Sequence, residues 1–176
     1  MTVLQPSQIM THASASVRWR SSPTALKSQW IDHNGHLNMA YYMVIFDLGS
    51  DEVFDRVGLG PQYRQRHGLT TYTVQAQICY LQEVKPASTV HTEMTILDVD
   101  EKRIHTIQEL FADNNTSASA TCEMITLSID PHGPKAAPFP GSVYSKLQTG
   151  MKQHRFLKKP AQAGQTLSLS RRSKSQ

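Results

Sequence analysis

The sequence has few cysteines and no long apolar segment, and each shortage excludes a class of protein. Only two of its 176 residues are cysteine, Cys79 and Cys122, and their separation indicates neither a zinc cluster nor a disulfide framework. We interpret both as buried free thiols, which implies a reducing compartment, and we expect a cytoplasmic protein. The longest apolar run, Met39 to Phe46, is too short to cross a bilayer. The N-terminus also lacks the pattern of a secretory signal, so no membrane partner is expected.

Two familiar motifs of hydrolases and nucleotide-binding proteins are also missing. Neither Gly49-Ser50 nor Gly141-Ser142 lies in a Gly-x-Ser-x-Gly sequence, which disfavours a serine hydrolase. The glycines of residues 58–61 have the wrong spacing for a phosphate-binding loop. His33 and His36 follow Asp32, but no third histidine is near enough to complete a metal site. We therefore expect neither a metal nor a cofactor.

Positive charge is concentrated at the C-terminal end of the chain. Residues 150–176 contain no acidic residue and seven basic ones: Lys152, Arg155, Lys158, Lys159, Arg171, Arg172 and Lys174. That leaves eleven basic against fourteen acidic residues in 1–149, so the remainder is mildly acidic. We predict an N-terminal extension over 1–14, a single domain over 15–157 and a basic disordered tail over 158–176. No nucleic-acid partner is expected.

The apolar pattern predicts one long helix followed by several strands. Apolar residues recur at helical spacing from Met39 to Val57, a helix of about five turns that ends at Gly58. Alternation from Tyr72 to Tyr80 predicts a strand with one buried face. The remaining expected elements are strand segments at Val17–Ser21 and Ala25–Ile31, strands at Thr89–Val99, Arg103–Phe111 and Ser117–Ile129, a loop at Pro131–Pro140 and a short helix at Ser142–Leu157. Residues 63–68 are interpreted as a polar connecting segment.

This order of elements predicts an α+β domain in which an antiparallel sheet packs on one helix. The first half of the helix is apolar almost all round, as expected of a central helix that a curved sheet surrounds. A short sheet around one helix leaves an edge strand without a partner. We therefore expect the protein to be a homodimer or a dimer of dimers.

The segment from Trp30 to Tyr42 carries the strongest chemical signal. Asp32 precedes an Asn34-Gly35 turn, and Asn38 is a candidate N-cap of the long helix. A carboxylate beside a helix N-terminus can attack or activate water, while the helix N–H groups stabilise a developing oxyanion. The residues alone also fit a plain turn or capping role for Asp32, Asn34 and Asn38.

The run Asp-x-Asn-Gly-His-x-Asn, followed by two aromatic residues and a helix, resembles the hotdog-fold acyl-CoA thioesterases of the 4-hydroxybenzoyl-CoA thioesterase type. The resemblance covers roughly residues 16–145 and implies a hotdog fold and hydrolysis of a small acyl-CoA. It implies that Asp32 is the nucleophile or general base and that Gly35 allows close backbone approach to the substrate. The helix start at Asn38 and Met39 would polarise the thioester carbonyl. His36 would fix the loop, with its ring paired to Asp32.

Three shorter segments are similar to the betainyl-CoA thioesterases of carnitine breakdown. These segments are Asn38-Met39-Ala40-Tyr41-Tyr42, Gly58-Leu59-Gly60 with Tyr63, and residues 100–105. The similarity implies a trimethylammonium acyl group, which aromatic rings would attract. The expected substrate contacts are Trp30, Asn34, Tyr41, Tyr42, Tyr72 and Gln75, with Phe46 and Tyr80 as further rings.

The chain departs from this narrower family at Gln75, because the matching position there is commonly acidic. Glu109 and Asp47 are candidate substitutes for the missing carboxylate. Lys85, Lys102 and Arg103 are expected to meet CoA phosphates, although they are equally ordinary as solvated turn charges.

Two alternatives to a thioesterase stay open at this point. A hotdog hydratase or dehydratase would have histidine five residues after the aspartate and proline in place of Gly35, and here His36 comes four residues after Asp32. A non-catalytic acyl-CoA binding protein would use the same fold without releasing free thiol.

Overall fold

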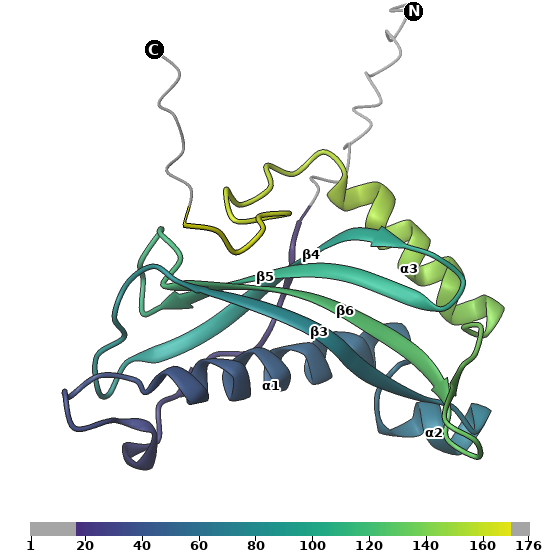
Figure 1. Cartoon of the computed structure of the whole chain (residues 1–176), viewed down its shortest axis with the longest axis horizontal. Helices are drawn as coiled ribbons and strands as arrows, with labels where there is room; N and C mark the ends of the chain where they lie inside the picture. The colour runs from purple at the N-terminus through teal and green to yellow at the C-terminus, as the bar shows by residue number, and fades with distance from the viewer. Residues whose placement is uncertain (1–16, 170–176) are drawn as a thin grey trace, which may run out of the picture.

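The computed structural model describes residues 17–169, which form one antiparallel sheet with a long helix across one face (Figure 1). The sheet has seven strands in the order β1-β4-β5-β6-β3, with β2 also paired to β4 and β7 to β6. The elements are β1 (Trp19–Arg20), β2 (Thr24–Ala25), α1 (Met39–Val57), α2 (Pro61–His67), β3 (Thr70–Tyr80), β4 (Thr89–Val99), β5 (Arg103–Ala112), β6 (Ala120–Asp130), β7 (Lys135–Ala136) and α3 (Gly141–His154). The α+β hotdog architecture is therefore confirmed.

Helix α1 has the predicted bounds because both of its ends are capped. The Asn38 side chain accepts a hydrogen bond from the Ala40 N–H, and Gly58 ends the helix in the left-handed conformation with φ of 95°. Its buried face packs under the sheet and consists of Tyr42, Ile45, Phe46, Gly49, Ser50, Val53, Phe54 and Val57.

The middle of α1 lies unusually close to the sheet. A Cβ added to Gly49 would lie 2.2 Å from the Thr92 Oγ1 atom on β4. On β5, the Gln108 side chain donates hydrogen bonds to the Phe46 carbonyl at 3.1 Å and to the Ser50 hydroxyl at 2.8 Å. These buried contacts leave the helix little freedom to slide along the sheet.

The N-terminal strands are shorter than the sequence pattern predicts. β1 and β2 have two residues each, and Ser28–Trp30 forms a turn of 3₁₀ helix instead of a strand. Ile31 makes only an isolated bridge with Leu37. The polar connecting segment expected at 63–68 contains most of α2, which Gly68 caps, and the Tyr63 hydroxyl bonds Ser128 at 2.9 Å. The expected loop at 131–140 contains the short strand β7.

Strand β3 contains a bulge that the alternating pattern conceals. The pairing with β6 shifts between Thr73, opposite Thr126, and Gln75, opposite Ile125, so Val74 is an extra residue. Downstream of the bulge, Ala76 lies opposite Met124 on the helix face of the sheet. Upstream, Tyr72 turns to the outer face. The prediction of one buried face along β3 was therefore wrong, and Tyr72 and Val74 are 48% and 55% exposed.

The C-terminal segment 158–169 crosses the outer face of the sheet, opposite α1 (Figure 1). Arg18 donates to the Lys158 carbonyl at 2.7 Å, and the Gly164 N–H donates to the Glu123 carboxylate at 2.7 Å. The Gln77 amide donates to the Gln165 carbonyl at 2.8 Å. This part of the segment expected to be disordered therefore has defined contacts. Residues 170–176 and the predicted N-terminal extension 1–14 lie outside the described residues.

The two cysteines lie in different environments. Cys122 is buried and Cys79 is only half-buried, which corrects the expectation that both are buried. Burial raises the pKa of the Cys122 thiol to about 12, so this thiol is unreactive at neutral pH. Across residues 17–169, no helix has the length and apolar character needed to cross a membrane.

The close approach at Gly49 predicts that a methyl group there destabilises the fold. Gly49→Ala should lower the free energy of unfolding by about 1–3 kcal/mol, because the added Cβ overlaps the Thr92 hydroxyl. Urea unfolding measures the change, and Thr92→Ala in the same chain should restore part of it. Gly141→Ala is the control, since a Cβ there meets no atom within 4 Å. A Gly49→Ala variant as stable as the parent chain would contradict this account of the helix contact.

Candidate active site

The loop from Ile31 to Leu37 is a small hairpin that places a carboxylate beside the start of α1. Its ends are joined by the Ile31–Leu37 bridge and by the Asp32 N–H, which donates to the His36 carbonyl at 2.9 Å. Gly35 donates back to the Asp32 carbonyl at 3.0 Å. Its φ of 80° is a left-handed conformation that favours glycine, so the backbone of the turn itself accounts for a glycine at position 35.

The Asp32 carboxylate has one oxygen held and one available. Its Oδ1 atom accepts from the Asn34 N–H at 2.8 Å and, at the long distance of 3.5 Å, from the His36 N–H. The Oδ2 atom has no hydrogen-bond partner among the described residues. The loop therefore fixes the orientation of the carboxylate while leaving an oxygen available for chemistry.

A second loop, residues 81–84, completes the site from the end of β3. The Leu37 N–H donates to the Val84 carbonyl at 2.9 Å and ties the two loops together. Across this junction the His36 Nε2 atom lies 3.2 Å from a Glu83 carboxylate oxygen. The expected pairing of the His36 ring with Asp32 was wrong: the ring meets Glu83, and only the backbone N–H of His36 approaches Asp32.

The start of α1 offers one free N–H group. The Ala40 N–H donates to the Asn38 side chain at 3.0 Å, and the Tyr41 N–H donates to the Asn38 carbonyl at 3.0 Å. The Met39 N–H has no acceptor within residues 17–169. Asn38 is thus a capping residue, and Met39 presents the donor.

These groups surround a cavity of about 550 Å³. It is lined by Asp32, Asn34, His36, Leu37, Met39, Tyr42, Tyr80, Leu81, Gln82 and Glu83. The Tyr42 and Tyr80 rings pack edge to face at 5.1 Å, and the Tyr80 hydroxyl donates to the Met39 carbonyl at 3.2 Å. Burial raises the pKa of Tyr42, and the negative charges of Glu83 and Asp32 add to that rise.

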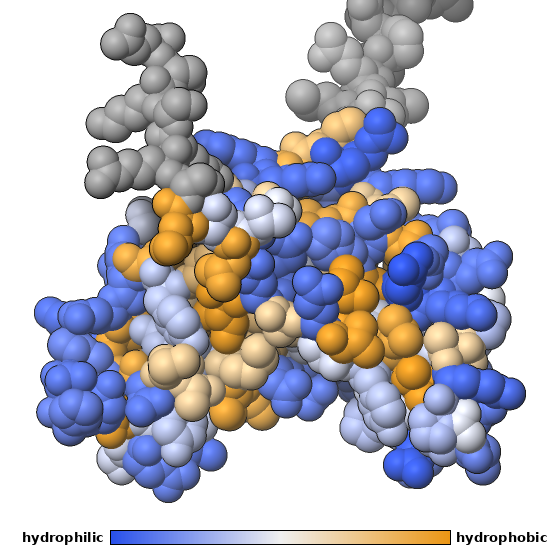
Figure 2. Space-filling view, viewed as in Figure 1, coloured by the Kyte–Doolittle hydropathy of each residue, from blue (hydrophilic) through white to orange (hydrophobic). Residues whose placement is uncertain are grey.

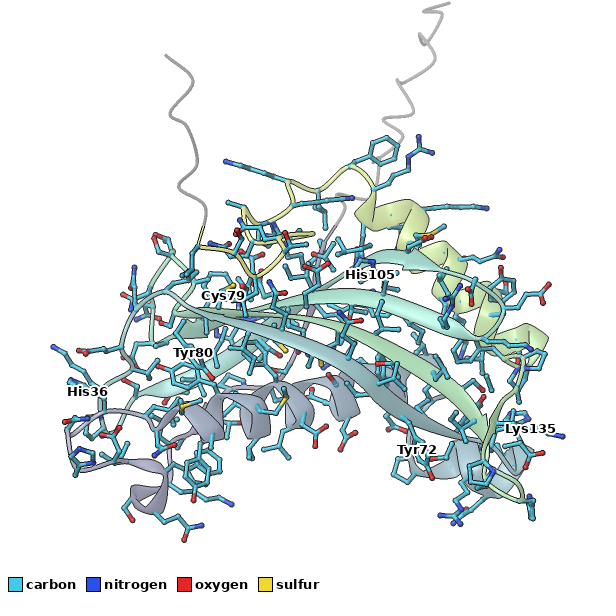
Figure 3. All side chains as sticks on the ribbon, in the orientation of Figure 1. His36, Tyr72, Cys79, Tyr80, His105 and Lys135 are labelled. Atoms are coloured by element: carbon cyan, nitrogen blue, oxygen red, sulfur yellow. The ribbon has the colours of Figure 1, made fainter. Side chains whose placement is uncertain are left out.

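Four of the residues predicted to bind substrate do not line this cavity. Trp30 is 3% exposed and belongs to the core cluster, and the half-buried Tyr41 ring stacks on it at 5.7 Å. Tyr72 lies at the far end of the sheet from His36 and Tyr80 (Figure 3). Gln75 lines a separate cavity of about 310 Å³ on the outer face, together with His105 and Arg103.

The three predicted phosphate-binding residues lie in two places. Lys85 is exposed in the loop after β3, next to the residues of the cavity. Lys102 and Arg103 lie at the turn between β4 and β5, where the Arg103 guanidinium is already paired with Asp100 at 2.6 Å.

The two candidate substitutes for an acidic residue at position 75 lie elsewhere. Asp47 is exposed on α1, and Glu109 is paired with Arg18 at 3.2 Å. Neither lines the cavity around Asp32. Within the described part of the chain, no group of three or more metal-binding side chains comes together.

Sequence reasoning missed Glu83 and named Tyr80 only as one of several available rings. Both are about fifty residues from Asp32, and they reach it only because the Leu37–Val84 hydrogen bond joins the two loops. No local motif carries that information. The one available signal was the end of the predicted strand at Tyr80, since residues just after a strand often line sites.

The sheet, its single long helix and the carboxylate loop at the helix start define a hotdog-type domain with a hydrolase-like site. A family model described as the thioesterase-like superfamily matches residues 26–147. The chain belongs to this superfamily and is a thioester hydrolase.

Two curated relatives carry a narrower name. The betainyl-CoA thioesterase of Pseudomonas aeruginosa is 31% identical, over 83% of this chain and 92% of that protein. The L-carnitine dehydrogenase/betainyl-CoA thioesterase of Rhizobium meliloti is also 31% identical, over 85% of this chain. The chain covers only 30% of the length of that second protein.

Solved structures share the fold over most of the chain. A Staphylococcus aureus protein in complex with CoA superimposes with a TM-score of 0.80 and 25% identity, over 87% of this chain and 96% of that one. A candidate thioesterase from Pseudomonas putida KT2440 has a TM-score of 0.76 and 29% identity, over 88% and 98% respectively.

The hydrogen bonds of Asn38 predict a capping role that serine can replace. Asn38→Ala should lower the free energy of unfolding by about 1 kcal/mol, because the Ala40 N–H loses its acceptor. Asn38→Ser keeps a capping oxygen and should retain both stability and turnover. Thermal unfolding and thiol release measure the two quantities. Loss of turnover in a stable Asn38→Ser variant would instead indicate direct contact between Asn38 and the substrate.

Proposed function

We propose that the protein hydrolyses a small acyl-CoA, with betainyl-CoA as the substrate that the comparisons favour, giving betaine and CoA. The observation that carries this proposal is a cavity lined both by Asp32, which has one oxygen without a partner, and by Met39, whose N–H at the helix start is free. Its support is the identity with the Pseudomonas aeruginosa relative over nearly all of that protein.

In the proposed reaction, Asp32 assists attack on the thioester carbonyl. Its free Oδ2 atom either attacks the carbonyl carbon or takes a proton from the attacking water. Both routes need a carboxylate that stays ionised and oriented, and the hydrogen bonds to Oδ1 supply the orientation. The thiolate of CoA is then expelled, and in the first route water hydrolyses the resulting anhydride.

The Met39 N–H is the proposed oxyanion donor. When the carbonyl carbon becomes tetrahedral its oxygen gains negative charge, and a fixed N–H at the positive end of a helix dipole stabilises that charge. The other two N–H groups of the first three are already taken by Asn38. Because the donor is a backbone group, the exposed Met39 side chain has no required chemical role.

A second copy of the chain would unite the two groups of predicted site residues. One group lies at the Tyr80 end of β3, and the other, with Tyr72, Lys102 and Arg103, lies at the Tyr72 end, about 26 Å away along the strand (Figure 3). β3 is an edge strand, paired only with β6 among the described strands. Antiparallel pairing of two β3 strands about a two-fold axis would bring the Tyr72 end of one copy beside the Tyr80 end of the other.

The apolar side chains exposed along β3 and α1 support this pairing. Val74 is 55% exposed, and Leu48 and Val44 on α1 are 49% and 38% exposed. Apolar residues gather on the face of the molecule that carries these two elements (Figure 2). We therefore propose a homodimer through β3, with the active site completed at the interface.

The role of Asp32 predicts a large kinetic effect without loss of the fold. Asp32→Asn should reduce kcat by about 10²–10⁴-fold, because the amide cannot act as base or nucleophile. Free thiol release from acyl-CoA measures turnover, and circular dichroism checks the fold. Asp130→Asn, in the distant turn where Asp130 bonds His132, is the matched control and should leave kcat unchanged. Near-normal turnover in Asp32→Asn would refute the assignment, and acyl-CoA binding without any thiol release by the parent chain would indicate a non-catalytic binding protein.

The proposed interface predicts that one charge on β3 gives an inactive monomer. Val74→Asp should halve the mass in sedimentation equilibrium and reduce kcat/KM, because a carboxylate cannot be buried unpaired between two strands. Phe156→Asp is the matched control, since Phe156 is 76% exposed on the segment after α3. A Val74→Asp variant that stays dimeric and active would place the interface elsewhere.

A further inference from the structure

Glu83 is a carboxylate of the cavity that has no role in the proposed mechanism. It lies three residues after the end of β3, and its side chain is 75% exposed at the edge of the cavity. Its only side-chain partner within residues 17–169 is the His36 ring, whose Nε2 atom lies 3.2 Å from the Glu83 carboxylate. Since the His36 N–H also approaches Asp32, the two carboxylates lie on either side of the same histidine.

The charges around the cavity favour a cation. Two carboxylates line it, and neither lysine nor arginine is among its described lining residues. The raised pKa of Tyr42, to which burial contributes most and the charges of Glu83 and Asp32 add, is a sign of the same negative potential. CoA itself is strongly anionic, so this potential does not serve its phosphates.

Two aromatic rings lie in the same cavity. Tyr42 and Tyr80 meet edge to face at 5.1 Å, but Tyr42 is 4% exposed, so Tyr80, at 47%, is the ring that a ligand can reach. Ring faces attract quaternary ammonium groups, and such groups cannot donate hydrogen bonds that would require a precise acceptor. A carboxylate beside rings is therefore a suitable environment for a trimethylammonium group.

The chemistry of a betainyl ester limits where this recognition can take place. Its ammonium nitrogen is bonded to the carbon next to the thioester carbonyl, so the cation lies within a few bond lengths of the reacting atom. A residue that recognises it must therefore lie in the Asp32 cavity. Gln75, the position at which the family pattern suggested an acidic residue, lines a different cavity of this chain.

We propose that Glu83 is a specificity residue that binds the cationic end of the acyl group, with the exposed Tyr80 ring beside it. This inference rests on the proposed thioesterase function. His36 holds the Glu83 carboxylate at the cavity edge in the free protein. When the substrate binds, water is excluded from the contact between the Glu83 carboxylate and the substrate cation, and the attraction between these two charges becomes stronger. Asp32, in contrast, stays available for the reaction at the carbonyl.

A pair of isosteric substrates separates charge recognition from shape. In 3,3-dimethylbutanoyl-CoA a neutral carbon replaces the ammonium nitrogen of betainyl-CoA, and the size is nearly the same. The parent chain should prefer betainyl-CoA in kcat/KM. Glu83→Gln should lower kcat/KM for betainyl-CoA by about tenfold, mainly through KM, because one charge interaction at the cavity is lost. The same variant should change the value for the neutral ester less than about threefold.

Three further variants serve as controls. Glu83→Asp keeps the charge and should keep the preference for the cationic ester. Glu101→Gln, on the exposed turn between β4 and β5, should change neither substrate. His36→Asn removes the histidine partner of Glu83 but not the charge, so the preference should persist even if turnover falls.

The possible results differ clearly. An equal loss for both esters in Glu83→Gln would overturn the proposal and would make Glu83 a positioning residue for His36. A parent chain that hydrolyses both esters equally would overturn it while leaving the thioesterase function standing. A parent chain that hydrolyses neither, nor any other small acyl-CoA, would defeat the proposed function itself.

Discussion

The close contact between α1 and the sheet is the constraint on which the rest of the structure depends. With no side chain at Gly49, the helix backbone reaches the Thr92 side chain, and Gln108 bonds the helix from the neighbouring strand. These buried polar bonds fix the helix along its own axis, which apolar packing alone does poorly because it is not directional. The position of Met39, at the first residue of the same helix, follows from that contact at Gly49, ten residues away.

The site then forms where two loops meet at the helix start. The first loop brings a carboxylate and a histidine, the second brings another carboxylate, and the end of β3 adds the Tyr80 ring. One backbone hydrogen bond between Leu37 and Val84 joins them. In the proposed mechanism the helix start supplies a backbone donor, and the loops supply side chains that lie at the surface of the core.

Much of the fold could be predicted because its signals are local. The bounds of α1 follow from Asn38, Gly58 and the apolar spacing between them, and β4 was predicted over Thr89–Val99 as it is found. The Asp32–Met39 part of the candidate site could be predicted from the sequence because it is contiguous. Glu83 could not be found in this way, since its place depends on a contact between distant loops. The outward direction of Tyr72 was missed because the bulge at Val74 cannot be recognised in the alternation of apolar and polar residues. The bulge nevertheless places Tyr72 and Ala76 on opposite faces of the sheet.

The extra residue in β3 also affects how lengths can change in this strand. Without Val74, Thr73 and Gln75 would lie opposite Thr126 and Ile125 in an unbroken ladder, so a deletion at this position leaves all neighbouring side chains on the faces they already occupy. A deletion elsewhere in β3 turns over every side chain between itself and the bulge. If an alignment places the gap after Gln75 instead of at Val74, it compares side chains from opposite faces of the sheet. Gln75 is affected first, because it directly follows the bulge.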